Sequence, residues 1–188
     1  MSYYWKEDSD RLFDYDIMIP ERTLYVGGEV DEGMAERFLK GMLILEAKSH
    51  NPITIILNSG GGDEYHGMAI YDAIAASPCH VTVKMYGHAM SMGSWIPQAA
   101  DERIMSKNAT MMIHYGSWGG YEMESIHVKS MHQENQRLTK AMEDEYLRRI
   151  REKNPDFAAA KLRRWLTEEK YLTAAEAVEL GLADRIIE

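Results

Sequence analysis

The sequence is poor in features that mark secreted, membrane-spanning or nucleic-acid-binding proteins. It holds one cysteine, Cys79, which excludes a disulfide within the chain and favours a reducing compartment. Lys and Arg (21) are outnumbered by Asp and Glu (30), and the net charge of −9 repels phosphate backbones. No uncharged apolar run reaches the roughly 18 residues of a membrane helix, and the polar start MSYYWKEDSD is unlike a signal peptide. We expect a soluble, cytoplasmic protein with no nucleic-acid or membrane partner.

Metal-binding and nucleotide-binding spacings are also missing. The sequence contains neither GxxxxGK[ST] nor GxGxxG with a following acidic residue. Its seven histidines form no HExxH or similar ligand spacing, and His127 and His132 diverge because they are five residues apart on an expected helix. The sequence therefore predicts no metal site and implies no cofactor.

Strand and helix patterns alternate along the chain. Its 188 residues, 45% of them hydrophobic, suit one domain with a sizeable core. Apolar strands expected at 22–30, 53–59 and 80–87 are separated by helical patterns, which favours βαβ units and a mostly parallel sheet. The strand at 53–59 is apolar enough to be buried on both faces. Residues 1–12 are expected to be loosely ordered. A long polar helix at about 122–155 would project from the domain or pack in an oligomer.

Three stretches carry residues suited to catalysis. NSGGGDEYHG (58–67) puts glycines between a strand and a helix, where backbone N–H groups can hold an oxyanion or a phosphate. Ser91, in GHAMSMGSWIP, lies at a strand-to-helix turn where the Met92 N–H and the helix dipole favour negative charge. His114 follows an apolar strand, at a strand end where sites collect. The alternatives are an ordinary glycine turn, a helix N-cap and a structural histidine.

These stretches match one family in order and spacing. NSGGGDEYHGMAIYDAI is similar to the N-S-P-G-G…G-M-x-I-Y-D segment of the proteolytic subunit of the Clp protease (ClpP), and GHAMSMGSWI to its G-x-A-A-S-M-G serine motif. MMIHYGSWGGY resembles its M-I-H-x-P…G-G histidine motif, and YLTAAEAVELGLADRI its F-[ML]-S-A-x-E-A-x-x-Y-G-L-[VI]-D ending. The resemblance runs from about Phe13 to the C-terminus. It implies a single ClpP-like peptidase domain over residues 1–188.

The resemblance also implies a fold and a site. The family fold is α/β, a spiral of βαβ units of the ClpP/crotonase type, in which the long helix is a projecting handle. Carried over by motif, Ser91 is the nucleophile and His114 the general base. The N–H groups of Gly62 and Met92 form the oxyanion hole, and Gly61 supports the glycine loop. The family assembles as two stacked heptameric rings, cleaves unfolded proteins or peptides, and uses a separate Clp-type ATPase.

The chain departs from the family pattern in four places. The third triad residue of the family is an aspartate, and the matching position holds Glu169, which we expect to orient His114; a surface charge is the alternative. Gly60 replaces the family proline, which makes the glycine loop less rigid. HYGSWGG also lacks a proline, and the span from His114 to Glu169 is a few residues longer than usual. The segment before Phe13, which forms the axial pore loops in the family, is short.

Four interpretations of the function follow. The favoured one is a serine endopeptidase that hydrolyses peptide bonds through an acyl-enzyme. A non-catalytic ring subunit would keep the fold without the chemistry. A crotonase-type acyl-CoA enzyme would share the spiral and an oxyanion hole, but the serine and histidine motifs are not typical of it. A phage-type processing protease that works without an unfoldase would fit the short N-terminal segment.

Overall fold

The computed structural model describes residues 12–116 and 125–187, with side chains from residue 128 onward in the second range. Residues 1–11 of the expected loosely ordered segment, and residues 122–124 of the expected long helix, lie outside the described residues. Within the described ranges, no helix is both long enough and apolar enough to cross a membrane.

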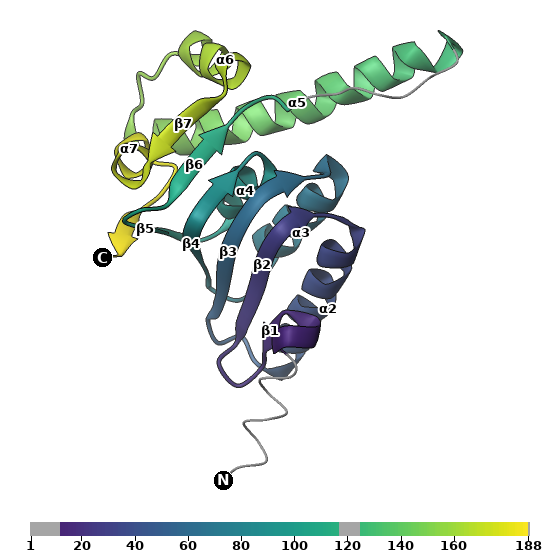
Figure 1. Ribbon diagram of the computed structural model, residues 1–188, viewed down its shortest axis with the longest axis vertical. Helices are drawn as coiled ribbons and strands as arrows, with labels where there is room; N and C mark the ends of the chain where they lie inside the picture. Colours follow the sequence, from purple (N-terminus) through teal and green to yellow (C-terminus); the bar gives the residue numbers. More distant parts are fainter. Residues whose placement is uncertain (1–11, 117–124, 188) are drawn as a thin grey trace.

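An eight-stranded sheet forms the centre of the structure (Figure 1). Its order is β1-β2-β3-β4-β5-β8, with β6 pairing with both β4 and β7. The pairs among β2, β3, β4, β5, β6 and β8 are parallel, whereas β1–β2 and β6–β7 are antiparallel. The expected parallel sheet is confirmed. The strands are β1 (Ile17–Met18), β2 (Thr23–Val30), β3 (Ile53–Gly62), β4 (Val81–Met90), β5 (Glu102–Ser106), β6 (Thr110–Ile113), β7 (Lys170–Thr173) and β8 (Arg185–Ile187).

Side chains at their first turns fix where several helices begin. The Asp31 carboxylate accepts the Met34 N–H at the start of α2, and Asp63 does the same for α3. Thr173 and Glu176 form the expected capping box of α7. The helices are α2 (Glu32–Lys48), α3 (Glu64–Ala75), α4 (Met92–Trp95), the 3-10 helix η1 (Ile96–Ala99), α5 (Ser125–Lys153), α6 (Ala159–Glu168) and α7 (Ala174–Leu180).

The central strand β3 is fully buried on one face only. Ile53, Ile55 and Leu57 are buried, whereas Thr54 and Ile56 between them are partly exposed. The prediction of a strand buried on both faces was wrong. The reason is that α2 and α3 lie side by side on the same side of the sheet (Figure 1), so one set of alternate side chains is covered.

Strand β4 changes partner halfway along its length. Its first half, Thr82–Met85, pairs with β5, and its second half, His88–Met90, pairs with β6. Gly87 lies between the halves with φ +62, and a Cβ atom there would lie 2.8 Å from Asn58 Oδ1. The same oxygen accepts the His88 N–H at 3.3 Å. The change of partner carries the end of β4 to β6.

The long helix α5 has one buried stripe on an otherwise polar surface. Leu138, Met142, Tyr146 and Ile150, four residues apart, are buried. Figure 1 shows the N-terminal half of α5 projecting beyond the rest of the molecule, as expected for this pattern. The C-terminal half is therefore the part that packs on the domain.

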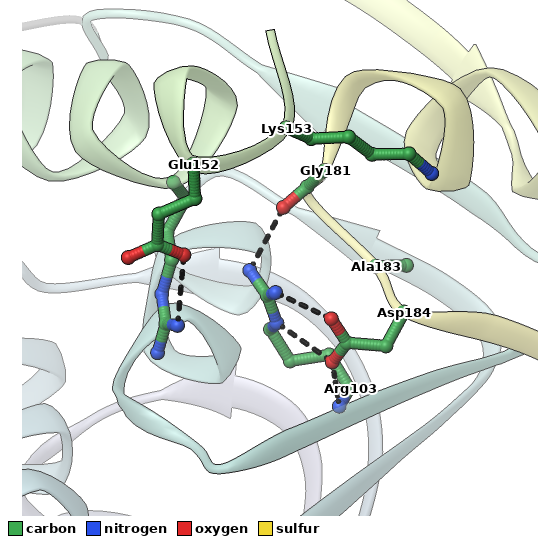
Figure 2. Close-up of a pocket in the computed structure, with 7 residues that line it drawn as sticks. Arg103, Glu152, Lys153, Gly181, Ala183 and Asp184 are labelled. Atoms are coloured by element: carbon green, nitrogen blue, oxygen red, sulfur yellow. Dashed lines mark hydrogen bonds and ion pairs between the residues drawn. The ribbon is translucent and has the colours of Figure 1, made fainter. Parts of the chain in front are cut away.

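A buried arginine joins the C-terminal segment to the sheet (Figure 2). Arg103 of β5 forms a bidentate pair with Asp184, at 3.0 and 2.6 Å, and its Nη1 donates to Gly181 O at 2.9 Å. Arg103 and Asp184 line a cavity of about 210 Å³ that also exposes Glu152 and Lys153. The Arg103 guanidinium is already bound to Asp184 and Gly181. We therefore interpret these residues as a structural connection between β5 and the C-terminal segment, and not as a ligand site.

Asp184→Asn should destabilise the fold in a pH-dependent way. Burial alone would raise the pKa of Asp184, but the hydrogen bonds and charge of Arg103 lower it overall. Because the pKa of Asp184 is lower in the folded than in the unfolded chain, the ionised carboxylate stabilises the fold at pH values above the unfolded pKa of about 3.9. This stabilisation is lost as the pH falls through the pKa of the folded state. We expect a loss of about 2 kcal/mol in the free energy of unfolding at pH 7, shrinking below about pH 4.

Urea unfolding of both proteins across this pH range is the measurement. Asp16→Asn is the matched control, because it removes the carboxylate of an exposed pair with Arg37 and should cost less than about 0.5 kcal/mol. Equal losses in the two variants would contradict the structural role of Arg103 and Asp184.

Candidate active site

Ser91 occupies a strained turn between β4 and α4. Its backbone angles are φ 53 and ψ −126, a conformation that residues with a side chain rarely adopt. Its N–H donates to Met112 O of β6 at 2.9 Å, and its carbonyl accepts the Ser94 and Trp95 N–H groups. Such strain costs roughly 1–3 kcal/mol and is commonly found at functional sites.

The Ser91 hydroxyl is directed at a histidine. Among the described residues it caps no backbone N–H of α4, although Ser91 stands at the N-cap position. Its Oγ lies 2.8 Å from His114 Nε2. If Nε2 accepts the Ser91 proton, the imidazole carries its own proton on Nδ1. The contact favours a nucleophile over the N-cap alternative.

His114 lies directly after β6, and its side chain is 16% exposed. The antiparallel register of β6 and β7 pairs Ile113 with Lys170, so the next positions are His114 and Glu169. Glu169 Oε1 is 3.5 Å from His114 Nδ1. This separation is an ion-pair distance, longer than a typical hydrogen bond of 2.7–3.2 Å. The structure therefore brings all three residues together, with the histidine–glutamate contact the looser one.

Glu169 is placed by a second backbone kink. It ends α6 in the left-handed region, at φ 57 and ψ 82, and β7 starts at the next residue. Its side chain is 58% exposed, which is also what a surface charge would show. The register and the kink are what direct its carboxylate toward the imidazole.

The glycine run packs against the Ser91 turn. A Cβ atom at Gly61 would lie 2.6 Å from Ser91 Cβ and 2.9 Å from Met92 N. Gly61 also has φ +93, which glycine adopts readily. Its N–H donates to Ser59 Oγ at 3.1 Å, and that hydroxyl donates to Gly28 O at 2.6 Å. The glycine run was expected after the strand, but it continues β3 to Gly62.

Gly62 lies where the end of β3 pairs with β2. Val30 pairs with Gly62, and Asp63 N donates to Val30 O at 2.8 Å. A Cβ atom at Gly62 would lie 2.3 Å from Val30 O, so the backbone there departs from regular strand geometry. Of the two expected oxyanion donors, Met92 follows Ser91 directly as the first residue of α4, and Gly62 follows Gly61, which packs against Ser91.

A buried carboxylate connects the histidine strand to two helices. Glu143 of α5 is 7% exposed; it accepts the Tyr115 hydroxyl at 3.0 Å and Arg163 Nε of α6 at 2.8 Å. Burial, then the hydrogen bond and charge of Glu143, raise the pKa of Tyr115 to about 12. Tyr115 follows His114, and α6 leads to Glu169. This network was missed from the sequence because its members are far apart along the chain.

The described residues were also compared for side chains that bind metal ions. No group of three or more His, Cys, Asp or Glu side chains is close enough there to hold a metal ion. His127 was considered from the sequence, and its side chain lies outside the description.

A family model for the Clp protease matches residues 7–188. The chain belongs to the Clp protease family. It is 31% identical over 185 residues to an ATP-dependent Clp protease proteolytic subunit from Deinococcus radiodurans, covering 95% of this chain and 87% of that protein. The solved structure of a ClpP1 mutant from Listeria monocytogenes superimposes with a TM-score of 0.77 at 28% identity, over 90% of this chain and 93% of that one. The ClpP resemblance and fold are confirmed.

Gly61→Ala should lower the reactivity of Ser91 in the folded protein. The added Cβ would overlap Ser91 and crowd Met92 N, so we expect at least a ~100-fold loss, comparable to loss of an oxyanion donor. The rate of labelling by a fluorophosphonate measures this reactivity.

Gly28→Ala is the matched control for Gly61→Ala. Gly28 has a similar φ of +84, but a Cβ there would meet no described atom within 4 Å. Both variants carry the cost of a left-handed backbone at a residue with a side chain, and Gly61→Ala carries the steric overlap as well. Per folded molecule, only Gly61→Ala should lose labelling. Equal labelling of the two variants would contradict the close approach of Gly61 to Ser91.

Proposed function

We propose that this chain is a serine-type endopeptidase that hydrolyses peptide bonds of unfolded proteins or peptides. The observation that carries the proposal is the 2.8 Å contact between Ser91 Oγ and His114 Nε2 at a strained strand-to-helix turn. A helix-capping serine would direct its hydroxyl at a backbone N–H instead. A non-catalytic ring subunit would have no need for the strained backbone conformation of Ser91.

The proposed mechanism follows from the geometry. His114 takes the Ser91 proton as Ser91 Oγ attacks the peptide carbonyl, and the imidazolium then protonates the leaving amine. In this proposal the Gly62 and Met92 N–H groups, the pair that the family resemblance implies, bind the developing oxyanion and stabilise charge that is present only in the transition state. Glu169 stabilises the imidazolium from the Nδ1 side. Water, activated by His114, then hydrolyses the acyl-enzyme.

The proposed partners come from the family. The Deinococcus relative is named as the proteolytic subunit of an ATP-dependent protease, which supports a separate Clp-type ATPase that delivers unfolded chains. We extend this to a cytoplasmic homo-oligomer of two stacked heptameric rings. The projecting half of α5 (Figure 1) supports such packing, since a polar helix standing free of the domain buries little apolar surface by itself. Family membership also disfavours the acyl-CoA interpretation.

Fluorophosphonate labelling of the assembled protein tests the proposal. The wild type should be labelled and should hydrolyse unfolded peptides, and Ser91→Ala should do neither. Glu169→Ala should lower the labelling rate by less than the ~10⁴-fold seen for a buried triad aspartate, because Glu169 is half-exposed and its contact with His114 is long.

Glu168→Ala is the matched control for the third residue. Glu168 is the neighbouring carboxylate, exposed to 63% and paired at 3.9 Å with Arg164. Its removal should leave labelling within about twofold, as expected for an exposed pair. Equal effects at Glu168 and Glu169 would support the surface-charge alternative for Glu169. An assembled wild type that is neither labelled nor active would overturn the proposed function.

A further inference from the structure

A buried tyrosine of the long helix reaches the turn that carries Ser91. Tyr146 of α5 is fully buried, and its hydroxyl lies 2.7 Å from Ser94 Oγ in α4. Ser94 is also fully buried. Burying two hydroxyl groups is unfavourable unless each is hydrogen-bonded, so the pair joins two elements that are 52 positions apart in the chain.

The direction of this hydrogen bond follows from the neighbouring one. Ser94 Oγ donates its single proton to Ser91 O at 2.7 Å. It therefore accepts from Tyr146, and the chain runs from the Tyr146 hydroxyl through Ser94 to the Ser91 carbonyl. Burial raises the pKa of Tyr146, so the phenol keeps the proton that it donates.

The Ser91 carbonyl shares a peptide unit with the Met92 N–H. A peptide unit is planar and trans, so the carbonyl and the N–H point in opposite, fixed directions. Any contact that fixes the direction of Ser91 O thus also fixes the direction of the Met92 N–H. The angle that sets this plane is the Ser91 ψ of −126. Ser94 Oγ supplements the Ser94 and Trp95 N–H groups that hold the same oxygen.

We propose that Tyr146, acting through Ser94, is a positioning residue that aims the Met92 N–H into the oxyanion hole. The inference rests on the proposed function, because it assigns a role to that N–H. Among the described residues, Tyr146 forms no hydrogen bond with Ser91 Oγ or His114; its proposed effect passes through the Ser91–Met92 peptide plane.

Tyr146→Phe is the direct test, since it removes one hydroxyl and keeps the ring. The oxyanion contact exists only in the transition state, so kcat should fall with KM unchanged. We expect about a tenfold fall, smaller than the ~10²–10³ of removing an oxyanion donor, because the N–H remains. The fraction of subunits labelled by a fluorophosphonate should stay at the wild-type value while the labelling rate falls. A variant that merely folds poorly would lose labelled fraction instead.

Tyr71→Phe is the matched control. Tyr71 of α3 also lies near α5, and burial, followed by the charge of Glu145, raises the pKa of Tyr71 to about 12. Its ring stacks on Trp95 of α4 at 4.1 Å. The substitution removes a tyrosine hydroxyl beside the same turn and leaves the Tyr146–Ser94 hydrogen bond in place. Its kcat should stay within about twofold of the wild type, as for a hydrogen bond outside the reacting centre.

Ser94→Ala completes the experiment. It should lower kcat at least as much as Tyr146→Phe, and adding Tyr146→Phe to it should have no further effect, because both belong to one chain. An unchanged kcat in Tyr146→Phe, or a further loss in the double variant, would overturn the inference alone. If Tyr146→Phe lowers the labelled fraction, Ser94→Ala becomes the test: a lower kcat supports the inference, and an unchanged kcat overturns it. An unlabelled wild type would overturn the proposed function and this inference together.

Discussion

The candidate site depends on one residue, Ser91, that has a side chain but adopts a backbone conformation usually found only in glycine. Ser91, at φ 53 and ψ −126, costs roughly 1–3 kcal/mol relative to a relaxed turn. The surrounding contacts offset that cost: Met112 O accepts its N–H, and Ser94 and Trp95 hold its carbonyl. With backbone and carbonyl both bound, the side chain is left to face His114. The strain and the reactive geometry therefore have the same cause.

Holding this turn explains why glycine gathers around it. Gly87 lies where β4 changes its pairing partner from β5 to β6. At Gly61, β3 comes so close to Ser91 that a side chain on residue 61 would overlap it. Gly60, where the family has proline, is different, because a Cβ there would meet only His88 Nε2, at 3.9 Å, among the described atoms. Its neighbour Ser59, which the family motif also contains, binds Gly61 N and Gly28 O.

The features that could be predicted from the sequence were those encoded by residues close together along the chain. Periodicity located the main strands and helices, and the motifs around Ser91 and His114 located the two residues that lie 2.8 Å apart. The contact of Glu169 could not be derived that way, since it depends on the β6–β7 register between segments more than 50 residues apart. β7 and α6 are short and have weak signals of their own. The polar character of the long helix was predicted, but its buried stripe of Leu138, Met142 and Tyr146 was not, and no sequence pattern pairs Tyr146 with Ser94.

The long helix α5 contacts the candidate site in two places, one near His114 and one near Ser91. Through Glu143 it holds Tyr115, which follows His114, and Arg163 of the helix that ends at Glu169. One turn further along, through Tyr146, it holds Ser94 and the Ser91 carbonyl. A shift of α5 would therefore displace His114 and the Ser91 turn together. Of the three side chains, the Glu169 carboxylate is the least constrained, since it is 58% exposed and lies 3.5 Å from His114 Nδ1.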